Sequence, residues 1–249
     1  MKRITSASNP EYKRMRGLLE DKRMRDELGL FAVEGAKMIR DAFSAGVKLE
    51  RLFVAEDKAA EFEGVWAGET YLLTPQLAAR LSGTLAPQGA VAAVRMPQPA
   101  TLADAGGFAV VLDGVTDPGN LGTIVRTCAA FGVKSLFLRD CCDIYNPKCV
   151  RSSMSGIFHV KTTKITRAEF TDFAESGYRI VIADMGGADV ETFVPGGKIL
   201  LVLGSEAHGV SAEIRALSSA AVSVKIGGVE SLNVAAAAAI LIYKMTNTP

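Results

Sequence analysis

Three groups of polar residues between positions 113 and 233 of this 249-residue chain have the residue types and spacing of a catalytic site. The first group, residues 113–127, follows an apolar segment of strand-like length. Asp117 followed by Pro118 is a strong helix start, so Asn120 is expected in the first turn and Arg126 further along the same helix. Helix capping explains Asp117 and Pro118, but it does not explain polar side chains gathered at the end of a buried strand. We therefore treat Asn120 and Arg126 as candidate catalytic residues.

The second and third groups combine glycine-rich turns with isolated polar side chains. Residues 204–209 follow another apolar segment, and a glycine at a strand end lets a ligand approach the backbone closely. Residues 226–233 lead into an apolar helix over 234–245, which Ser231 is expected to cap. His208 is interpreted as a hydrogen-bonded loop residue and is left outside the candidate site.

Apolar segments that alternate with helical stretches indicate how these groups come together. Continuous apolar runs separated by helices predict a parallel sheet covered on both faces, which is an α/β fold. Ligands of such sheets bind beyond the carboxyl ends of the strands, where the candidate residues stand. The expected strands are 109–112, 135–138, 179–183, 199–203 and 221–224.

The first hundred residues predict a separate, smaller α/β domain. A helix over 10–28 is expected to begin at an Asn-Pro pair and to end at Gly29, and a second helix is expected over 36–45. Prolines within 96–100 and the glycine pair 106–107 interrupt the pattern. The expected strands are 31–33, 52–54 and 89–94. The predicted organisation is an N-terminal domain over 1–97, a linker over 98–106 and a C-terminal domain over 107–249.

The formal net charge of +1 gives no global sign of nucleic-acid binding, so any RNA site must be local. Residues 1–25 hold eight basic residues against three acidic ones, a local charge of +5. A solvated helix face is the ordinary explanation of such a run, and contact with RNA phosphates is the other. The candidate RNA-binding residues of this segment are Arg14, Arg16, Arg23 and Arg25.

The cysteines predict neither a disulfide framework nor a metal site. Adjacent Cys141 and Cys142 rarely pair with each other, and with Cys149 and His159 they lack the paired two-residue spacing of structural zinc sites. They are interpreted as core or loop residues of a protein in the reducing cytoplasm. The longest apolar run, 234–243, is too short to span a bilayer, and no apolar stretch follows the N-terminus, so neither a membrane span nor a secretory signal is expected.

Three segments carry a resemblance to a known family. Residues 117–127 (DPGNLGTIVRT), 203–209 (LGSEAHG) and 229–234 (VESLNV) are similar to the three ordered motifs of the SpoU/TrmH family. Members are RNA ribose 2′-O-methyltransferases of the SPOUT superfamily, and their cofactor is S-adenosylmethionine. Residues 146–154 resemble the segment that joins the first two motifs. Residues 31–35 (FAVEG) and 86–89 (APQG) resemble the ribosomal-protein-like substrate-binding domain that precedes the catalytic domain in many members.

The resemblance implies features that the residue pattern alone does not. It implies a C-terminal trefoil knot, which the general rarity of knotted chains argues against and which rests on the resemblance alone. It also implies a homodimer with the active site near the subunit interface, which suits the apolar last helix. No metal is required.

The resemblance assigns roles to the candidate residues. The family's motif-one arginine, here Arg126, is held to activate the ribose hydroxyl. Because arginine is a very poor base, we expect it to stabilise the developing alkoxide instead, with the proton passing to an RNA phosphate. Asn120 would orient Arg126 or the ribose, and Glu206 would hold the arginine in place. Ser231 and Asn233 would contact substrate or cofactor.

The remaining binding residues are also assigned by similarity. Backbone around Leu203, Gly204, Ile226 and Leu232 would receive the cofactor. Relatives often have a proline-containing strand before the third motif, and its absence from residues 224–227 leaves the contacts around Lys225 and Ile226 open. Arg151 is the candidate for an RNA phosphate, since a guanidinium fork suits phosphate oxygens.

Two other classes of protein are weighed against this prediction. A non-catalytic RNA-binding or ribosome-assembly protein would not need all five candidate catalytic residues. A nicotinamide-dependent dehydrogenase would need a glycine fingerprint, which residues 113–117 lack. The opening residues 4–10 (ITSASNP) resemble members that act on large-subunit (23S) ribosomal RNA, and tRNA remains the alternative substrate.

Overall fold

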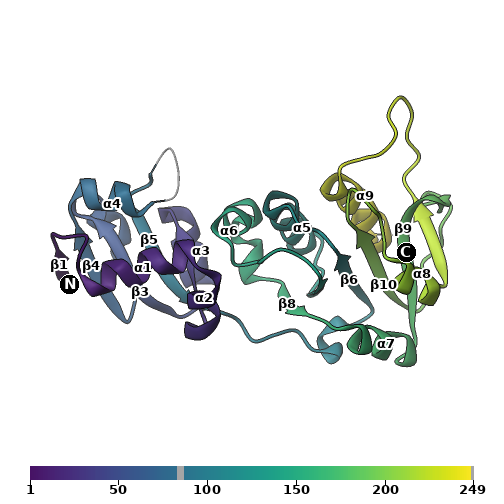
Figure 1. The fold of residues 1–249 in the computed structure, drawn as a ribbon, viewed down its shortest axis with the longest axis horizontal. Coiled ribbons are helices and arrows are strands. Elements are labelled where there is room, and N and C mark those ends of the chain that lie inside the picture. The colour runs from purple at the N-terminus through teal and green to yellow at the C-terminus, as the bar shows by residue number, and fades with distance from the viewer. Residues whose placement is uncertain (83–86, 248–249) are drawn as a thin grey trace. The chain divides into compact units, whose positions relative to one another are not determined.

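A computed structural model describes residues 1–82 and 87–247, so Ala86 of the 86–89 segment lies outside the described residues. The chain divides into two compact units, each of mixed α/β structure (Figure 1). Unit 1 comprises Met1–Pro97 and Asp143–Phe158, and unit 2 comprises Gln98–Cys142 and His159–Pro249. The segment Asp143–Phe158 therefore makes its contacts in unit 1, although it stands between the candidate motifs in the sequence.

Unit 2 is built on a sheet of parallel strands in the order β11-β9-β10-β6-β7-β8. All five strands expected in this half of the chain are present, so the predicted parallel sheet is confirmed. The additional edge strand, β8, has the polar sequence Lys-Thr-Thr-Lys, which no apolar pattern reveals. The strands are β6 (Phe108–Asp113), β7 (Ser135–Arg139), β8 (Lys161–Lys164), β9 (Tyr178–Asp189), β10 (Lys198–Gly204) and β11 (Ala220–Ser223).

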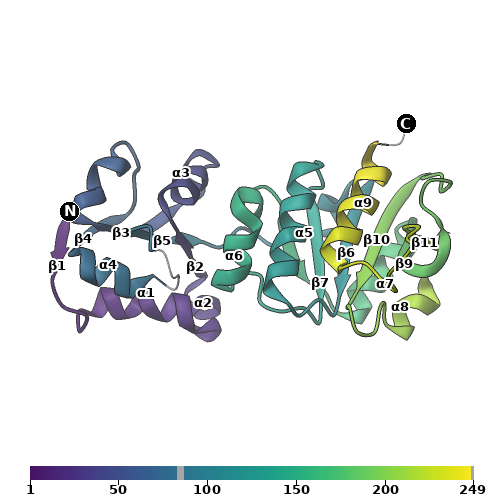
Figure 2. The same ribbon diagram turned by 90° about the horizontal axis from the view of Figure 1, so that it is seen from above.

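Helices cover both faces of this sheet, as the continuous apolar strands require. Alternate strand residues, among them Val111, Ile180 and Leu200, form one buried cluster with Phe170 of α7 and Ile214 of α8. On the other face α9 packs against α5 and β10, as Figure 2 shows. The helices are α5 (Pro118–Ala130), α7 (Arg167–Glu175), α8 (Ala212–Leu217) and α9 (Val234–Asn247), with a 3₁₀ turn at Leu102–Ala105.

The last helix, α9, has apolar residues on two sides, but α5 and β10 cover only one of them. Ala238, Leu241 and Ile242 are buried, whereas Ile240 and Tyr243 are 36% and 49% exposed. Among residues 1–82 and 87–247, no helix combines the length and apolar character needed to cross a membrane. The trefoil knot implied by the resemblance stays a prediction.

Unit 1 contains a smaller mixed sheet in the order β1-β4-β3-β5-β2. Strands β1, β4 and β3 run parallel, and β5 runs antiparallel to both β3 and β2. The strands are β1 (Lys2–Ile4), β2 (Leu30–Glu34), β3 (Leu49–Ala55), β4 (Glu69–Leu73) and β5 (Ala90–Arg95). The helices are α1 (Pro10–Glu20), α2 (Lys22–Leu28), α3 (Ala36–Ser44), α4 (Pro75–Leu81) and α6 (Pro147–Ser153), with 3₁₀ turns at Glu56–Phe62 and Met154–Phe158.

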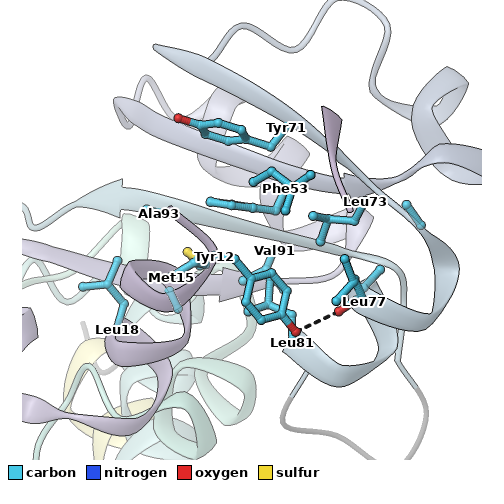
Figure 3. Close-up of a cluster of buried hydrophobic side chains, with 14 of the residues drawn as sticks. Tyr12, Met15, Leu18, Phe53, Tyr71, Leu73, Leu77, Leu81, Val91 and Ala93 are labelled. Carbon is cyan, nitrogen blue, oxygen red and sulfur yellow. Dashed lines mark hydrogen bonds between the residues drawn. The ribbon is translucent and has the colours of Figure 1, made fainter. Parts of the chain in front are cut away.

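The core of unit 1 lies between its sheet and helices α1 and α4 (Figure 3). Tyr12, Met15 and Leu18 recur every three residues and form the buried side of α1. The Tyr12 hydroxyl donates a hydrogen bond of 3.1 Å to the carbonyl oxygen of Leu77, so its polar end is satisfied inside the core.

The expectation of one helix over 10–28 is wrong, because Asp21 divides that segment into α1 and α2. Its backbone is extended, at φ −119° and ψ 115°, and its side chain accepts a hydrogen bond of 2.8 Å from the Arg23 amide. Aspartate favours such local capping over a helix-interior conformation. The break starts α2 at Lys22 and directs Arg25 towards the interior of unit 1.

Arg25 is a structural residue rather than an RNA contact. It is 3% exposed, and its Nη2 atom lies 2.7 Å from Oδ2 of Asp143. Its Nη1 atom donates a further hydrogen bond of 2.8 Å to the Leu18 carbonyl. Since a buried guanidinium with these partners has no access to a phosphate, the prediction that Arg25 binds RNA is withdrawn.

The cysteines are free thiols, and Cys128 and Cys149 are buried. Burial raises the pKa of Cys128 to about 12 and that of Cys141 to about 11, so both thiols stay protonated at neutral pH. The burial of Cys128 and Cys149 fits core positions, and the interpretation of Cys141, Cys142 and His159 as core or loop residues stays a prediction.

Replacing Arg25 should destabilise unit 1. Arg25→Ala leaves the largely buried Asp143 carboxylate without its cation, and such a loss costs about 3–5 kcal/mol in the free energy of unfolding. Arg23→Ala, two residues away on an exposed side chain, should change it by about 0.5 kcal/mol at most. Urea unfolding followed by circular dichroism measures both. Equal stability of the two variants would contradict the role given to Arg25.

Candidate active site

Unit 2 contains a cavity of about 400 Å³ at the carboxyl ends of β10 and β11. Its walls are residues 183–185 within β9, the segments that follow β10 and β11, and the start of α9. This is the position at which parallel sheets bind their ligands. The lining includes all four candidate cofactor residues, Leu203, Gly204, Ile226 and Leu232, and two candidate catalytic residues, Glu206 and Ser231.

The wall that follows β10 is a tight loop closed by its own hydrogen bonds. The Ser205 amide donates to the Gly209 carbonyl at 3.1 Å, and the Gly209 amide donates back to Ser205 at 2.9 Å. The His208 amide donates to the Ser205 hydroxyl at 3.2 Å. A Cβ atom on Gly204 would lie 2.0 Å from the carbonyl carbon of Gly209, a distance that no side chain tolerates. Glycine at position 204 is therefore required for the loop to close.

Asn120 connects the three motif segments. Its Nδ2 group donates a hydrogen bond to Oε1 of Glu206, and its Oδ1 atom accepts a hydrogen bond of 3.0 Å from Nδ2 of Asn233. The position of Asn120 is fixed by the predicted cap, because its amide donates to Oδ1 of Asp117 at 2.9 Å. The structure thus brings three of the five candidate catalytic residues into one hydrogen-bonded chain.

The cap of α9 is Asn233, and the expectation that Ser231 caps this helix is wrong. Oδ1 of Asn233 accepts hydrogen bonds of 2.9 Å and 3.3 Å from the amides of Ala235 and Ala236. The same side chain binds Asn120 through Nδ2, so it fixes the helix start and the motif contact together. Ser231 is exposed and lines the cavity.

Arg126 stands apart from this chain of hydrogen bonds. It is an exposed residue of α5, and within the part of the chain that the structure describes it makes no hydrogen bond or ion pair. The expectation that Glu206 holds Arg126 in place is not met, because Glu206 binds Asn120 instead. Arg126 is therefore a free cation on the helix whose first turn holds Asn120.

Asp184 and Arg215 line the cavity and were missed from the sequence. Arg215 forms an ion pair with the Asp184 carboxylate, and the Gly186 amide donates to the same carboxylate at 2.8 Å. These contacts lower the pKa of Asp184, so it is ionised at neutral pH. Asp184 follows the expected strand 179–183, but β9 continues to Asp189, so Asp184 lies within the strand and the strand-end rule does not account for it.

The candidate RNA-binding arginines of unit 1 differ in their surroundings. Arg16 is exposed but pairs with Glu20 at 2.8 Å, whereas no ion pair is present for Arg14 or Arg23 among the described residues. Nη1 of Arg151 lies 3.5 Å from the buried Oε2 of Glu34, which is an ion pair too long for a hydrogen bond.

Arg80 of α4 is an additional cation that charge counting over residues 1–25 could not include. Burial raises the pKa of Tyr12, and the positive charges of Arg80 and Arg16 oppose that rise. The two arginines therefore lie near the same ring, on the exposed sides of the packed helices α1 and α4. Arg80 extends the basic surface of α1 onto α4.

Comparison with known proteins identifies related chains. Residues 107–243 match the SpoU rRNA Methylase family, and residues 9–92 match the MRM3-like substrate binding domain. The chain is 29% identical to the 23S rRNA (guanosine(2553)-2′-O)-methyltransferase RlmP of Bacillus subtilis, covering 98% of this chain and 99% of the relative. It is 30% identical to the 23S rRNA (uridine(2479)-2′-O)-methyltransferase of Streptomyces viridochromogenes, over 98% and 91%.

The fold is similar to a solved structure as well. The SpoU methyltransferase AviRb from Streptomyces viridochromogenes, crystallised in complex with AdoMet, superposes with a TM-score of 0.86 at 28% identity, over 96% of this chain and 97% of that one. The family-model match spans more than half of the present chain and contains all three motifs. The resemblance seen in the sequence is confirmed, and the chain belongs to the SpoU rRNA Methylase family.

Proposed function

We propose that this protein transfers a methyl group from S-adenosylmethionine to a ribose 2′-hydroxyl of large-subunit ribosomal RNA. The observation that carries the proposal is the hydrogen-bonded chain of Glu206, Asn120 and Asn233, two members of which come from segments that line the cavity. The two curated relatives compared above are named as 23S ribosomal RNA 2′-O-methyltransferases. The proposed compartment is the cytoplasm, because the substrate is ribosomal RNA.

The cavity residues fit the proposed cofactor. Gly204 lets the loop 204–209 close against the cavity, and Leu203, Ile226 and Leu232 supply apolar surface. The ionised Asp184 and its partner Arg215 supply polar groups at the same cavity. S-adenosylmethionine carries an adenosine, a sulfonium and an amino acid end, and this mixture of apolar and charged lining suits it. When bound, it supplies an electrophilic methyl group.

The residues of this chain then have separable tasks. Methyl transfer is an in-line displacement, so the ribose oxygen must be held in one orientation while it loses its proton. The proton passes to an RNA phosphate, and Arg126 stabilises the negative charge that develops on the oxygen, as a free cation on α5 can do without giving up another partner. Asn120 of α5 holds the loop 204–209 and the start of α9 in place through its hydrogen bonds to Glu206 and Asn233. Ser231 contacts substrate or cofactor at the cavity wall.

Unit 1 would supply RNA affinity. We assign residues 1–97 to RNA binding and residues 107–249 to methyl transfer, joined by 98–106; within the second range, Asp143–Phe158 packs in unit 1, and the joining residues 98–106 belong to unit 2. Arg14, Arg23 and Arg80 lack ion-pair partners among the described residues, so binding a phosphate does not cost them an existing contact. Arg16 contributes less because Glu20 already pairs with it. The contact proposed for Arg151 stays a prediction.

A homodimer is proposed through the uncovered side of α9. Ile240 and Tyr243 expose apolar surface on this helix, and the Tyr243 ring lies 5.4 Å from the Phe131 ring at the end of α5. A second copy that covers this surface would bury apolar area next to the helix that carries Arg126.

The test of the proposed function is Arg126→Ala. The change removes stabilisation of the transition state and should slow methyl transfer roughly 100- to 1000-fold. The free energy of unfolding should change by only about 0.5 kcal/mol, because the side chain is exposed. Arg126→Lys should restore activity partly, since it keeps the charge but loses the planar fork. Single-turnover transfer of labelled methyl groups to unmodified ribosomal RNA measures the rate, with calorimetry of cofactor binding as the control. A folded alanine variant with near-normal turnover would remove the role assigned to Arg126.

The RNA surface is tested with the triple variant Arg14→Gln, Arg16→Gln, Arg23→Gln. Losing these phosphate contacts should weaken RNA binding and reduce the slope of log K against log salt by about two. Arg16→Gln alone should have the smallest effect of the three single changes. Filter binding over a salt series gives the slopes, and cofactor affinity should not change. An unchanged slope would mean that these arginines form only a solvated helix face.

The dimer surface is tested with Tyr243→Glu and Ile240→Glu. A carboxylate buried without a partner at an interface costs several kcal/mol, so the dimer dissociation constant should rise at least about 100-fold. Ala174→Glu, at an exposed position of α7, is the matched control. Sedimentation velocity over a concentration series reads out the assembly state. A wild-type monomer, or a Tyr243→Glu dimer as stable as the control, would refute the proposed surface.

A further inference from the structure

Asp113, the last residue of β6, is a buried carboxylate with a complete set of partners. It is 4% exposed, and its Oδ1 atom accepts a hydrogen bond of 2.8 Å from Nη1 of Arg139, its neighbour on β7. Its Oδ2 atom accepts a hydrogen bond of 2.8 Å from the backbone amide of Ser211. Nη1 of Arg139 also donates to the Ser211 hydroxyl at 2.9 Å, so both side chains meet the same residue.

The two ends of the cavity loop are both attached to Asp113. Gly204 stands opposite Asp113 in the pairing of β10 with β6, so the loop leaves the sheet beside this carboxylate. Ser211 lies two residues beyond Gly209, and its amide brings the chain back to the same side chain. All six residues from Gly204 to Gly209 line the cavity, whereas Asp113 itself does not.

This arrangement gives the carboxylate a task beyond general stability. A loop whose ends are held loses little conformational entropy when a ligand binds. The smaller entropy cost strengthens the binding of the ligand. The same loop carries Glu206, whose contact with Asn120 depends on where the loop lies. An ion pair used only for folding would not need to bind the backbone of the residue that ends a ligand-binding loop.

We propose that Asp113 and Arg139 are positioning residues that hold the loop 204–209 in its cofactor-binding form. They touch neither cofactor nor RNA and act through Ser211. The proposal rests on the proposed function in identifying the ligand as S-adenosylmethionine. The anchoring itself is a property of the free protein and can be measured without any ligand.

Ser211 offers a substitution that removes a single donor. Its φ of −57° is close to the value that proline imposes, and proline has no amide hydrogen. Ser211→Pro therefore deletes the hydrogen bond to Asp113, and it also removes the hydroxyl. Ser211→Ala removes only the hydroxyl and keeps the amide. The difference between these two variants isolates the bond between the loop and the carboxylate.

The first readout is the dissociation constant of S-adenosylmethionine by calorimetry, with the wild-type protein as reference. Ser211→Pro should bind at least about tenfold more weakly than Ser211→Ala. Asp113→Asn, which keeps the shape and loses the charge, should follow the proline variant. Glu213→Gln, which removes the charge from the half-exposed outer partner of Arg139, should bind within about twofold of wild type.

The second readout is amide hydrogen exchange without cofactor at Ser205, His208 and Gly209, the donors of the loop's own hydrogen bonds. Exchange should be at least about tenfold faster in Ser211→Pro than in Ser211→Ala. Equal exchange and equal affinity in the two variants would overturn the proposal, even with a lower melting temperature in the proline variant, because that pattern marks a purely structural role. If the wild-type protein binds no S-adenosylmethionine, the proposed function fails, and the exchange comparison still decides the anchoring.

Discussion

The pairing of β10 with β6 is the constraint on which the rest of unit 2 depends. Residues paired between the two strands lie 91 positions apart in sequence, and the register sets Gly204 against Asp113. Because the strands are parallel, the segments that follow them leave the sheet at the same edge. One of these segments becomes the first turn of α5 and the other becomes the cavity loop. The contact between Asn120 and Glu206 is a consequence of this register.

Around that edge several polar side chains of the motifs hold one another or cap the helices. Asp117 caps α5 and Asn233 caps α9. The side-chain amide of Asn120 donates a hydrogen bond to Glu206 and accepts one from Asn233. A satisfied network of this kind is rigid and cannot change partners cheaply. Arg126 differs because the described residues leave its charge unpaired. A preorganised frame with one free cation is the arrangement that electrostatic stabilisation of a reacting oxygen requires.

The sequence was sufficient for the parts of the fold that local patterns determine. Apolar runs predicted five strands of the unit 2 sheet and β2, β3 and β5 of unit 1, but they missed β1 and the inner strand β4. The Asp-Pro pair placed the start of α5 correctly. The edge strand β8 was not predicted, because its residues Lys-Thr-Thr-Lys are polar and form a strand only by pairing with β7. Ser231 and Asn233 are both favourable N-cap residues, so the sequence could not tell at which of them α9 begins. In the structure Asn233 is the cap. Arg25 was misassigned because its partner, Asp143, lies 118 residues away, and no charge count can detect such a pair.

The same distinction bears on the RNA surface proposed for a chain of almost zero net charge. Ion pairs neutralise cations that the fold employs, such as Lys2 with Glu69 and Arg25 with Asp143. Those cations add to the local charge of residues 1–25, but a phosphate would have to replace the partner that each already has. The proposed RNA contacts therefore fall on arginines without partners among the described residues, Arg14, Arg23 and, outside that segment, Arg80. Charge that is unpaired in the fold, rather than net charge, is therefore the quantity that indicates where an RNA backbone binds.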